Sequence, residues 1–208
     1  MRVSINSFSG DAGLCDLTVG PFGVIGEIDY KRELSGETKE LVKLGHLSKK
    51  QGNACLFCAP SDNHGLKRLS AFLFEKGRLS SIFDVNDGSG KYSPSYGVGT
   101  FNVNGVKIGV LIGDDGFDCD LVKALSLCGC SAIIDLYPDF CNEKRENAAC
   151  FFSYAFGIDY LSVGTDKTIC CVAGGKKNTG GKLGGAEVYE LPCKRLYREI
   201  KMKKPGSR

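Results

Sequence analysis

The chain has 208 residues, of which 42% are apolar and 25% are charged, a balance that is typical of folded globular proteins and excludes wholesale disorder. No apolar run reaches the length of a membrane span and the first ten residues lack a signal-peptide core, so we expect a cytoplasmic protein with no membrane contact. The net charge of the whole chain is +3. Residues 194–208 carry seven Lys or Arg and one Glu and so contribute +6, which leaves residues 1–193 mildly acidic with a net charge of −3.

Eleven cysteines raise the question of a disulfide scaffold. Their number is odd, the chain is long, and many lie in apolar segments, which favours reduced, buried thiols in a cytosolic protein. The cysteines that we place in such segments are Cys55, Cys58, Cys128, Cys150, Cys170 and Cys171.

Apolar runs bounded by turn residues predict strands along the whole chain. In chain order these lie at residues 2–8, 15–21, 54–60, 66–85, 100–112, 131–138, 159–164, 168–174 and 186–191. The fourth and fifth runs are predicted hairpins, which turn at Lys76-Gly77 and Asn104-Gly105.

Three helices are predicted between these strands. They lie at residues 37–52, at residues 118–129 with Asp118 as the N-cap, and at residues 142–157. Residues 23–36, 84–98 and 175–185 are predicted loops. Helices that return between apolar strands predict an α/β fold of one or two layered sheets.

Most motifs of the chain favour structural explanations. The pair Cys55 and Cys58 has zinc spacing, but no second pair completes a site. His46 and His64 fall on a helix and in a turn, which does not suggest a nucleophilic dyad. The glycine-rich residues 174–185 lack the residue order of a phosphate loop, and the aspartates near residue 115 match no calcium loop. The sequence therefore predicts neither a metal nor a cofactor. Because residues 1–193 are acidic, we also expect no nucleic-acid partner.

Residues 107–138, KIGVLIGDDGFDCDLVKALSLCGCSAIIDLYP, run from a strand through a Phe-containing turn into a helix and a second strand. A hairpin at residues 101–109 precedes them, and further segments of matching character lie at residues 16–26, 49–85 and 153–164. Taken in order, these segments resemble the carbon–nitrogen hydrolase (nitrilase) superfamily over most of the chain.

The resemblance implies a reaction that needs three side chains. In that family a Cys attacks an amide or nitrile carbon, a Glu moves protons, and a Lys stabilises the tetrahedral intermediate. Here the nucleophile position falls on Gly113 and the Glu position on Phe22. The Lys position falls on Val85 or, with a different gap, on Leu79. The resemblance therefore implies that the catalytic set has been lost.

A later segment of the family supplies an Arg and a supporting Glu, where this chain has Tyr154 and Gly157. The resemblance implies a shortened nitrilase-like α-β-β-α sandwich of two mixed sheets with outer helices, formed by residues 1–193 and followed by a basic tail at 194–208. Phe8 and Cys15 lie too close for the family's helix between the first two strands. We expect its absence to leave apolar sheet surface open.

The resulting hypothesis is a pseudoenzyme that acts as a partner subunit or binds a small, neutral ligand in the old pocket. The predicted pocket residues are Phe22, Val85, Gly113, Asp114, Asp115 and Tyr137. The alternative is an amidase-type hydrolase of non-peptide carbon–nitrogen bonds that uses Cys119 as a displaced nucleophile, because a thiolate is favoured near a helix start, with Asp114 or Asp115 as acid or base.

The predicted assembly is a homodimer or a heteromer with a related subunit. The family associates through the helix after the nucleophile, the later helix and C-terminal segments. These helices carry Leu121, Val122 and Leu125, and Phe151, Phe152 and Phe156. We expect the tail from Lys194 onward to lie at or beside the contact.

Overall fold

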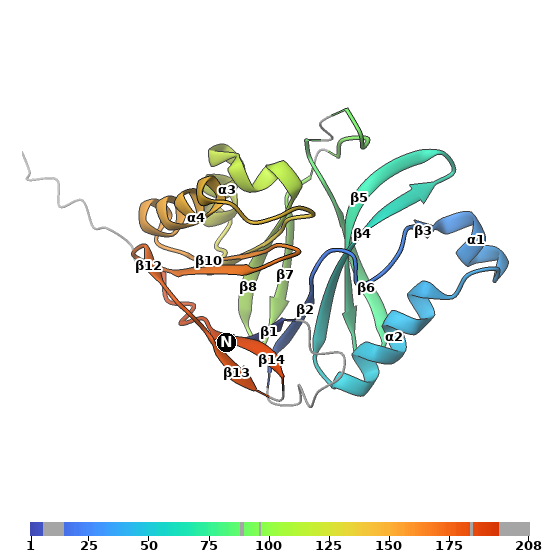
Figure 1. Ribbon diagram of the computed structural model, residues 1–208, viewed down its shortest axis with the longest axis horizontal. Helices are drawn as coiled ribbons and strands as arrows, with labels where there is room; N and C mark the ends of the chain where they lie inside the picture. Colours follow the sequence, from blue (N-terminus) through green and yellow to red (C-terminus); the bar gives the residue numbers. More distant parts are fainter. Residues whose placement is uncertain (6–14, 88–89, 96, 184, 196–208) are drawn as a thin grey trace, which may run out of the picture.

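Two mixed β-sheets packed face to face form the centre of the molecule, and helices cover their outer faces (Figure 1). The structure is a computed structural model, which describes residues 1–5, 15–87, 90–95, 97–183 and 185–195. No helix of these residues is long and apolar enough to cross a lipid bilayer.

Sheet A has the strand order β13-β14-β1-β2-β4-β5-β6, with β3 paired to β4. Its strands are β1 (Arg2–Ile5), β2 (Leu17–Gly20), β3 (Ile28–Asp29), β4 (Ala54–Asn63), β5 (Leu66–Glu75), β6 (Arg78–Asp84), β13 (Gly181–Leu183) and β14 (Ala186–Glu190). The pairs β1–β2 and β2–β4 are parallel, whereas β4, β5 and β6 pair antiparallel. The predicted turn between β5 and β6 is confirmed, since Lys76 and Gly77 adopt φ values of 52° and 83°.

Sheet B has the order β12-β11-β10-β9-β8-β7. Its strands are β7 (Gly99–Val103), β8 (Val106–Ile112), β9 (Ala132–Leu136), β10 (Asp159–Val163), β11 (Thr168–Val172) and β12 (Lys176–Lys177). The central strands β8, β9 and β10 are parallel, so their carboxyl ends meet at one edge of the sandwich. The predicted hairpin turn at Asn104-Gly105 is confirmed.

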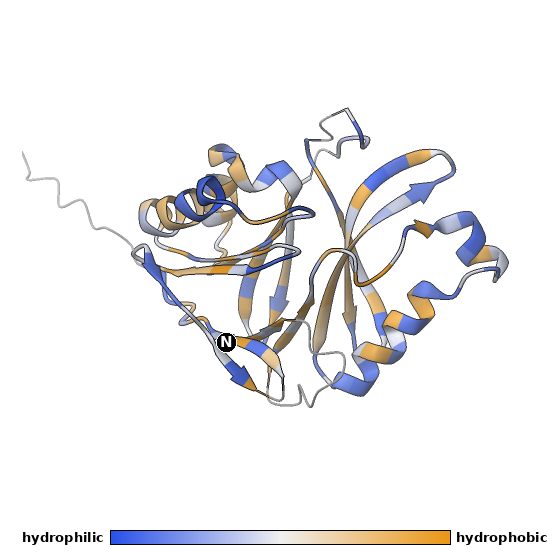
Figure 2. Cartoon of the chain, in the orientation of Figure 1, coloured by the Kyte–Doolittle hydropathy of each residue, from blue (hydrophilic) through white to orange (hydrophobic). Residues whose placement is uncertain are grey.

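The helices are α1 (Tyr30–Ser35), α2 (Glu40–Gln51), the 3₁₀ helix η1 (Gly113–Phe117), α3 (Cys119–Leu127) and α4 (Glu143–Phe156). Helix α2 packs on sheet A, where Leu44 meets Phe57 and Phe74. Helices α3 and α4 pack on sheet B through residues such as Leu125 and Phe152. In Figure 2 the strands are mostly apolar, whereas α2 and α4 carry both apolar and polar residues. This arrangement confirms the predicted sandwich of two mixed sheets with outer helices.

The outer surface of sheet A at β1 and β2 corrects one expectation. The predicted missing helix falls on residues 6–14, which lie outside the described residues. On the adjoining strands the residues that face outward are Ser4 and Thr18, whose hydroxyl oxygens lie 2.9 Å apart. Both are buried, and the Asn53 amide donates to the Thr18 hydroxyl at 3.0 Å. The expected open apolar surface is therefore wrong here, because small polar residues pair with one another.

Two predicted loops contain regular structure. Residues 23–36 include β3 and α1, and α1 begins where the Asp29 side chain accepts a hydrogen bond from the Arg32 N–H at 3.1 Å. Residues 175–185 include β12, which pairs in sheet B, and β13, which pairs in sheet A. The glycine-rich segment therefore crosses from one sheet to the other.

Candidate functional site

The turn after β8 is the place where the resemblance puts a nucleophile. Strand β8 is buried from Ile108 onward, and Gly113 then turns the chain into η1 with a φ of 62°. This left-handed conformation suits glycine, which has no Cβ to strain. A Cβ added at Gly113 would lie 3.6 Å from Leu69 Cδ2 and 3.9 Å from Val85 Cγ2. A side chain here would therefore point across the sandwich toward sheet A.

Sheet A closes this space with apolar side chains. Leu69 and Val85 are each 2% exposed, and the Val85 N–H donates to the Leu69 carbonyl at 2.9 Å. Phe22, which follows β2, is partly buried and packs against the same inter-sheet core. Leu69 and Val85 therefore line the space in front of the turn at Gly113, which we call the elbow, and Phe22 contacts the same inter-sheet core.

Val85 and Leu79, the two residues that the resemblance aligns with the family's Lys, have different surroundings. Val85 lies beside the elbow, whereas Leu79 is on β6 opposite Phe74 and is 39% exposed. Leu79 lines a groove of about 570 Å³ that also includes His46 of α2. Of the two, Val85 has the position from which a side chain could reach residue 113.

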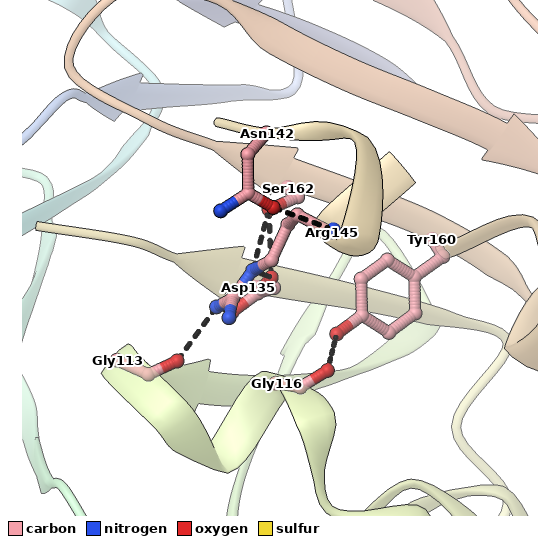
Figure 3. Close-up of polar contacts among 7 residues, drawn as sticks. All are labelled: Gly113, Gly116, Asp135, Asn142, Arg145, Tyr160 and Ser162. Atoms are coloured by element: carbon pink, nitrogen blue, oxygen red, sulfur yellow. Dashed lines mark hydrogen bonds and ion pairs between the residues drawn. The ribbon is translucent and has the colours of Figure 1, made fainter. Parts of the chain in front are cut away.

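A buried ion pair between Arg145 and Asp135 holds the backbone of the elbow (Figure 3). Arg145, in the first turn of α4, donates from Nε and Nη2 to the two carboxylate oxygens of Asp135 at 2.8 and 2.6 Å. Arg145 Nη2 also donates to the Gly113 carbonyl oxygen at 2.6 Å. The Tyr160 hydroxyl donates to the Gly116 carbonyl at 3.0 Å, so two side chains hold the backbone of η1.

Close packing at this pair explains Gly116. A Cβ at Gly116 would lie 2.5 Å from both Arg145 Nη2 and Asp135 Oδ1, so a larger residue would displace the ion pair. Burial lowers the pKa of Arg145, but the Asp135 carboxylate more than offsets this, so the guanidinium stays charged. Sequence reasoning missed this pair, although an aspartate inside the apolar strand at 132–136 was a signal that a cation must lie nearby.

Of the remaining predicted pocket residues, Asp115 and Tyr137 contact other parts of the chain. The Asp115 carboxylate accepts hydrogen bonds from the backbone N–H groups of Asn86 and Asp87 at 2.8 and 2.9 Å, which anchors the chain after Val85. Burial raises the pKa of Asp115, and these bonds oppose the rise only in part. Tyr137 stacks on Arg145, whose guanidinium carbon lies 3.9 Å from the ring centroid. Asp114 is exposed.

The candidate displaced nucleophile lies outside this cluster. Cys119 is exposed at the first position of α3, where Asp118 caps the helix through the N–H groups of Asp120 and Leu121. Cys128, expected to be buried, is also exposed, because it occupies the C-cap of α3. Within the described ranges no three His, Cys, Asp or Glu residues are grouped closely enough to hold a metal ion.

A cavity of about 230 Å³ has neither Phe22 nor Gly113 among its lining residues. It is lined by Pro21, which follows β2, and by residues 164–168, which lead from β10 into β11, together with Lys182 and Glu187. Its wall carries both positive and negative side chains. The lining therefore shows no single charge that would select a ligand.

No protein-family model and no curated protein sequence matches this chain. Solved structures from the nitrilase superfamily do. A cysteine-to-alanine variant of the Nesterenkonia AN1 amidase superposes with a TM-score of 0.71, covering 92% of this chain and 90% of that one at 14% identity. A glutamate-to-glutamine variant of the Nesterenkonia sp. AN1 amidase, with the acetamide moiety of fluoroacetamide on its active-site cysteine, gives 0.72 over 93% and 90% at 14% identity.

A cysteine-to-alanine variant of the same amidase in complex with butyramide gives a TM-score of 0.70 over 92% of this chain and 91% of that one, at 15% identity. The chain therefore has the fold of the nitrilase-superfamily amidases, and the predicted fold is confirmed over nearly the whole chain. At this level of identity the likeness defines the fold alone.

Proposed function

We propose that this chain is a nitrilase-fold pseudoenzyme that acts as a partner subunit and does not hydrolyse carbon–nitrogen bonds. The observation that carries the proposal is the packing at the elbow. A side chain at Gly113 would meet Leu69 and Val85, and Phe22 packs against the same core. These residues offer no nucleophile, no proton carrier and no cation for an oxyanion.

The same packing argues against a charged group hidden in this cluster. An unpaired charge buried beside Leu69 and Val85 would carry a large desolvation penalty. The same residues favour a role as a partner subunit over the binding of a small ligand in the family's substrate pocket. Their side chains occupy the space in front of residue 113, where a substrate would have to lie. The displaced-thiol alternative finds little support, since Cys119 is exposed and Asp115 is engaged by Asn86 and Asp87.

The surface of α3 and α4 supports a partner role. The predicted contact residues Val122, Leu125 and Phe152 are buried against sheet B, so they are not available to a partner. The same helices expose Leu127, Phe151 and Tyr154, which are 77%, 57% and 51% exposed, and we call these three the α3/α4 apolar surface. The Ser126 hydroxyl donates to the Phe156 carbonyl at 3.4 Å, so the carboxyl ends of the two helices lie together. Grouped exposed apolar residues are typical of interaction sites.

Activity assays test the loss of chemistry. We expect no hydrolysis of simple amides, nitriles or carbamoyl compounds above background, under conditions in which an active amidase of this fold turns over. Gly113→Cys alone should remain inactive, because it restores a thiol without a base or a cation.

The outcome that would overturn the proposal is robust turnover by the unmodified chain. Loss of that turnover in Cys119→Ala would assign it to the displaced thiol. The matched control is Cys128→Ala, which removes the exposed thiol at the other end of α3 and should leave any such activity unchanged.

A further inference from the structure

Cys150 and Cys171 form a close thiol pair between α4 and sheet B. Their Sγ atoms lie 3.0 Å apart, although the residues are 21 positions apart in the chain. Cys150 is on α4 and is partly exposed, whereas Cys171 is on β11 and fully buried. A disulfide bond is about 2 Å long, so the two sulfurs need to approach by only about 1 Å to be joined.

The backbone around the pair is already held in place. The Gly174 N–H donates to the Ser153 carbonyl at 3.2 Å, which fastens the turn after β11 to α4. A Cβ at Gly175 would lie 3.0 Å from Tyr154 Cβ and 3.3 Å from the Cys150 carbonyl oxygen, so this turn lies directly against the helix. Little backbone movement is therefore needed to bring the sulfurs together.

From this geometry we propose that Cys150 and Cys171 are an oxidisable dithiol, which a hydroperoxide converts into a disulfide that joins α4 to sheet B. The proposal does not depend on the proposed function. It assigns the two thiols different parts: Cys150 meets the oxidant, because solvent reaches it, and Cys171 completes the bond from the core.

The chemistry balances in two steps. The Cys150 thiolate attacks one peroxide oxygen, the O–O bond breaks, and the chain gains a sulfenic acid while the other oxygen leaves as water after taking a proton. The Cys171 sulfur then attacks the Cys150 sulfur, the S–O bond breaks, and a second water leaves with the Cys171 proton. Two thiols and one hydrogen peroxide thus give one disulfide and two waters.

Electrostatics around the pair agree with these parts. Burial raises the pKa of the Cys171 thiol far above its ordinary value, and Cys150 raises it further, so Cys171 stays protonated until a partner sulfur is oxidised. The Lys177 ammonium opposes this rise, and its side chain is paired with Glu146, one helical turn before Cys150. A cation therefore lies near the pair.

Peptide mapping tests the proposal on the full chain. The folded protein is treated with hydrogen peroxide, free thiols are blocked, and tryptic peptides are sequenced by mass spectrometry without reduction. We expect residues 146–167 and 168–176 to be joined through Cys150 and Cys171, and to separate after treatment with a dithiol. Because the shorter peptide also contains Cys170, the variants Cys170→Ala and Cys171→Ala are compared, and only the second should lose the link.

Because Cys171 is buried, Cys171→Ala could lose the link through a folding defect. Cys150→Ser changes a partly exposed residue, and this variant should also lose the link. Oxidation should raise the melting temperature of the unmodified chain by about 5–10 °C, because the cross-link restrains the unfolded state, and leave that of Cys150→Ser unchanged. If peroxide modifies Cys119 and Cys128 while Cys150 and Cys171 remain free thiols, the proposal is wrong. A link from Cys150 to Cys170 would also overturn it.

Discussion

Arg145 is the largest fully buried side chain of the described residues, and of its guanidinium nitrogens only Nη1 has no hydrogen-bond partner. The Asp135 carboxylate accepts hydrogen bonds from the Nε and Nη2 groups of Arg145. The guanidinium carbon of Arg145 lies 3.9 and 4.5 Å from the ring centroids of Tyr137 and Phe117. The Ser162 hydroxyl donates to the same carboxylate at 2.7 Å. This cluster contacts the Gly113 carbonyl, so a charged pair supports the backbone of the elbow.

Removing one member of the pair should therefore be costly. We expect Arg145→Met to lower the free energy of unfolding by about 3–5 kcal/mol, because Asp135 would be left as an uncompensated buried charge. Arg145→Met combined with Asp135→Leu should recover part of this loss, since neither charge is then buried. Urea denaturation followed by circular dichroism measures both changes.

The matched control is Arg2→Met, which breaks the exposed pair with Glu190. Exposed ion pairs contribute little, so the loss should be below about 1 kcal/mol. An Arg145→Met protein as stable as the Arg2→Met protein would show that the buried pair does not hold the elbow.

At the scale of elements, α2 depends on a cap supplied by its neighbour. Its N-cap residue, Lys39, makes no side-chain capping hydrogen bond. Instead, the Glu33 carboxylate at the end of α1 accepts from the N–H groups of Glu40 and Leu41 at 2.8 and 3.2 Å. Free N–H groups at a helix start need such acceptors, so α1 fixes where α2 begins.

This cap makes stability depend on pH. Burial raises the pKa of Glu33, but the interactions of its carboxylate, which include the hydrogen bonds from the N–H groups of Glu40 and Leu41, lower it more, so the folded-state pKa lies below the ordinary value. The stabilisation is therefore present above the unfolded pKa of about 4.3 and is lost as pH falls through the lower folded pKa. We expect Glu33→Gln to cost about 0.5–1 kcal/mol at pH 7, and the difference from the unmodified chain to shrink below about pH 4.

Denaturant unfolding at neutral and acidic pH measures this difference. Glu27→Gln is the control, because Glu27 is exposed in the loop before β3 and should show almost no effect at either pH. A Glu33→Gln difference that stays constant from pH 7 into the acidic range would mean that the carboxylate charge does not stabilise α2.

At the scale of the whole molecule, the end of the described chain ties the two sheets together. After β12 the chain leaves sheet B and enters β13 of sheet A. The Leu191 N–H then donates to the Met1 carbonyl at 2.8 Å, and the Cys193 N–H to Asp159 of sheet B at 2.7 Å. The Arg195 side chain donates to the Ser126 carbonyl of α3, while residues 196–208, which hold most of the predicted tail, lie outside the described residues.

The α3/α4 apolar surface leads to a prediction about assembly. We expect the chain to form a homodimer, or a heteromer with a related subunit, through Phe151, Tyr154 and Leu127, since closed two-fold pairing is the commonest way to cover such a surface. Phe151→Ser with Tyr154→Ser should raise the dissociation constant at least about tenfold, if the two rings are central to the contact. Sedimentation measures the change, and deletion of residues 194–208 tests whether the tail contributes.

Leu34→Ser provides the control, because Leu34 is 83% exposed on α1, away from α3 and α4. It should leave association unchanged. A monomer at high micromolar concentration, with or without the tail, would exclude the homodimer and leave the heteromer to be tested with a related subunit.

Local chemistry made much of this fold predictable from the sequence. The hairpin turns at 76–77 and 104–105 contain Gly77, Asn104 and Gly105, which tolerate positive φ, and Asp118 caps α3 by accepting hydrogen bonds from the N–H groups that follow it. Strand alternation and the order of segments gave the layers and their resemblance to the nitrilase fold. The absence of a nucleophile at residue 113 was also readable, because it depends on one residue type at one position.

Tertiary structure alone decided which distant residues meet. It placed Val85, and not Leu79, against the elbow, joined Arg145 to Asp135, and brought Cys150 to Cys171. It also decided that α4 buries Phe152 and exposes Phe151. Periodicity predicts which face of a helix or strand is buried, but not which element packs against that face. Contacts between residues far apart in sequence depend on how all the elements pack together.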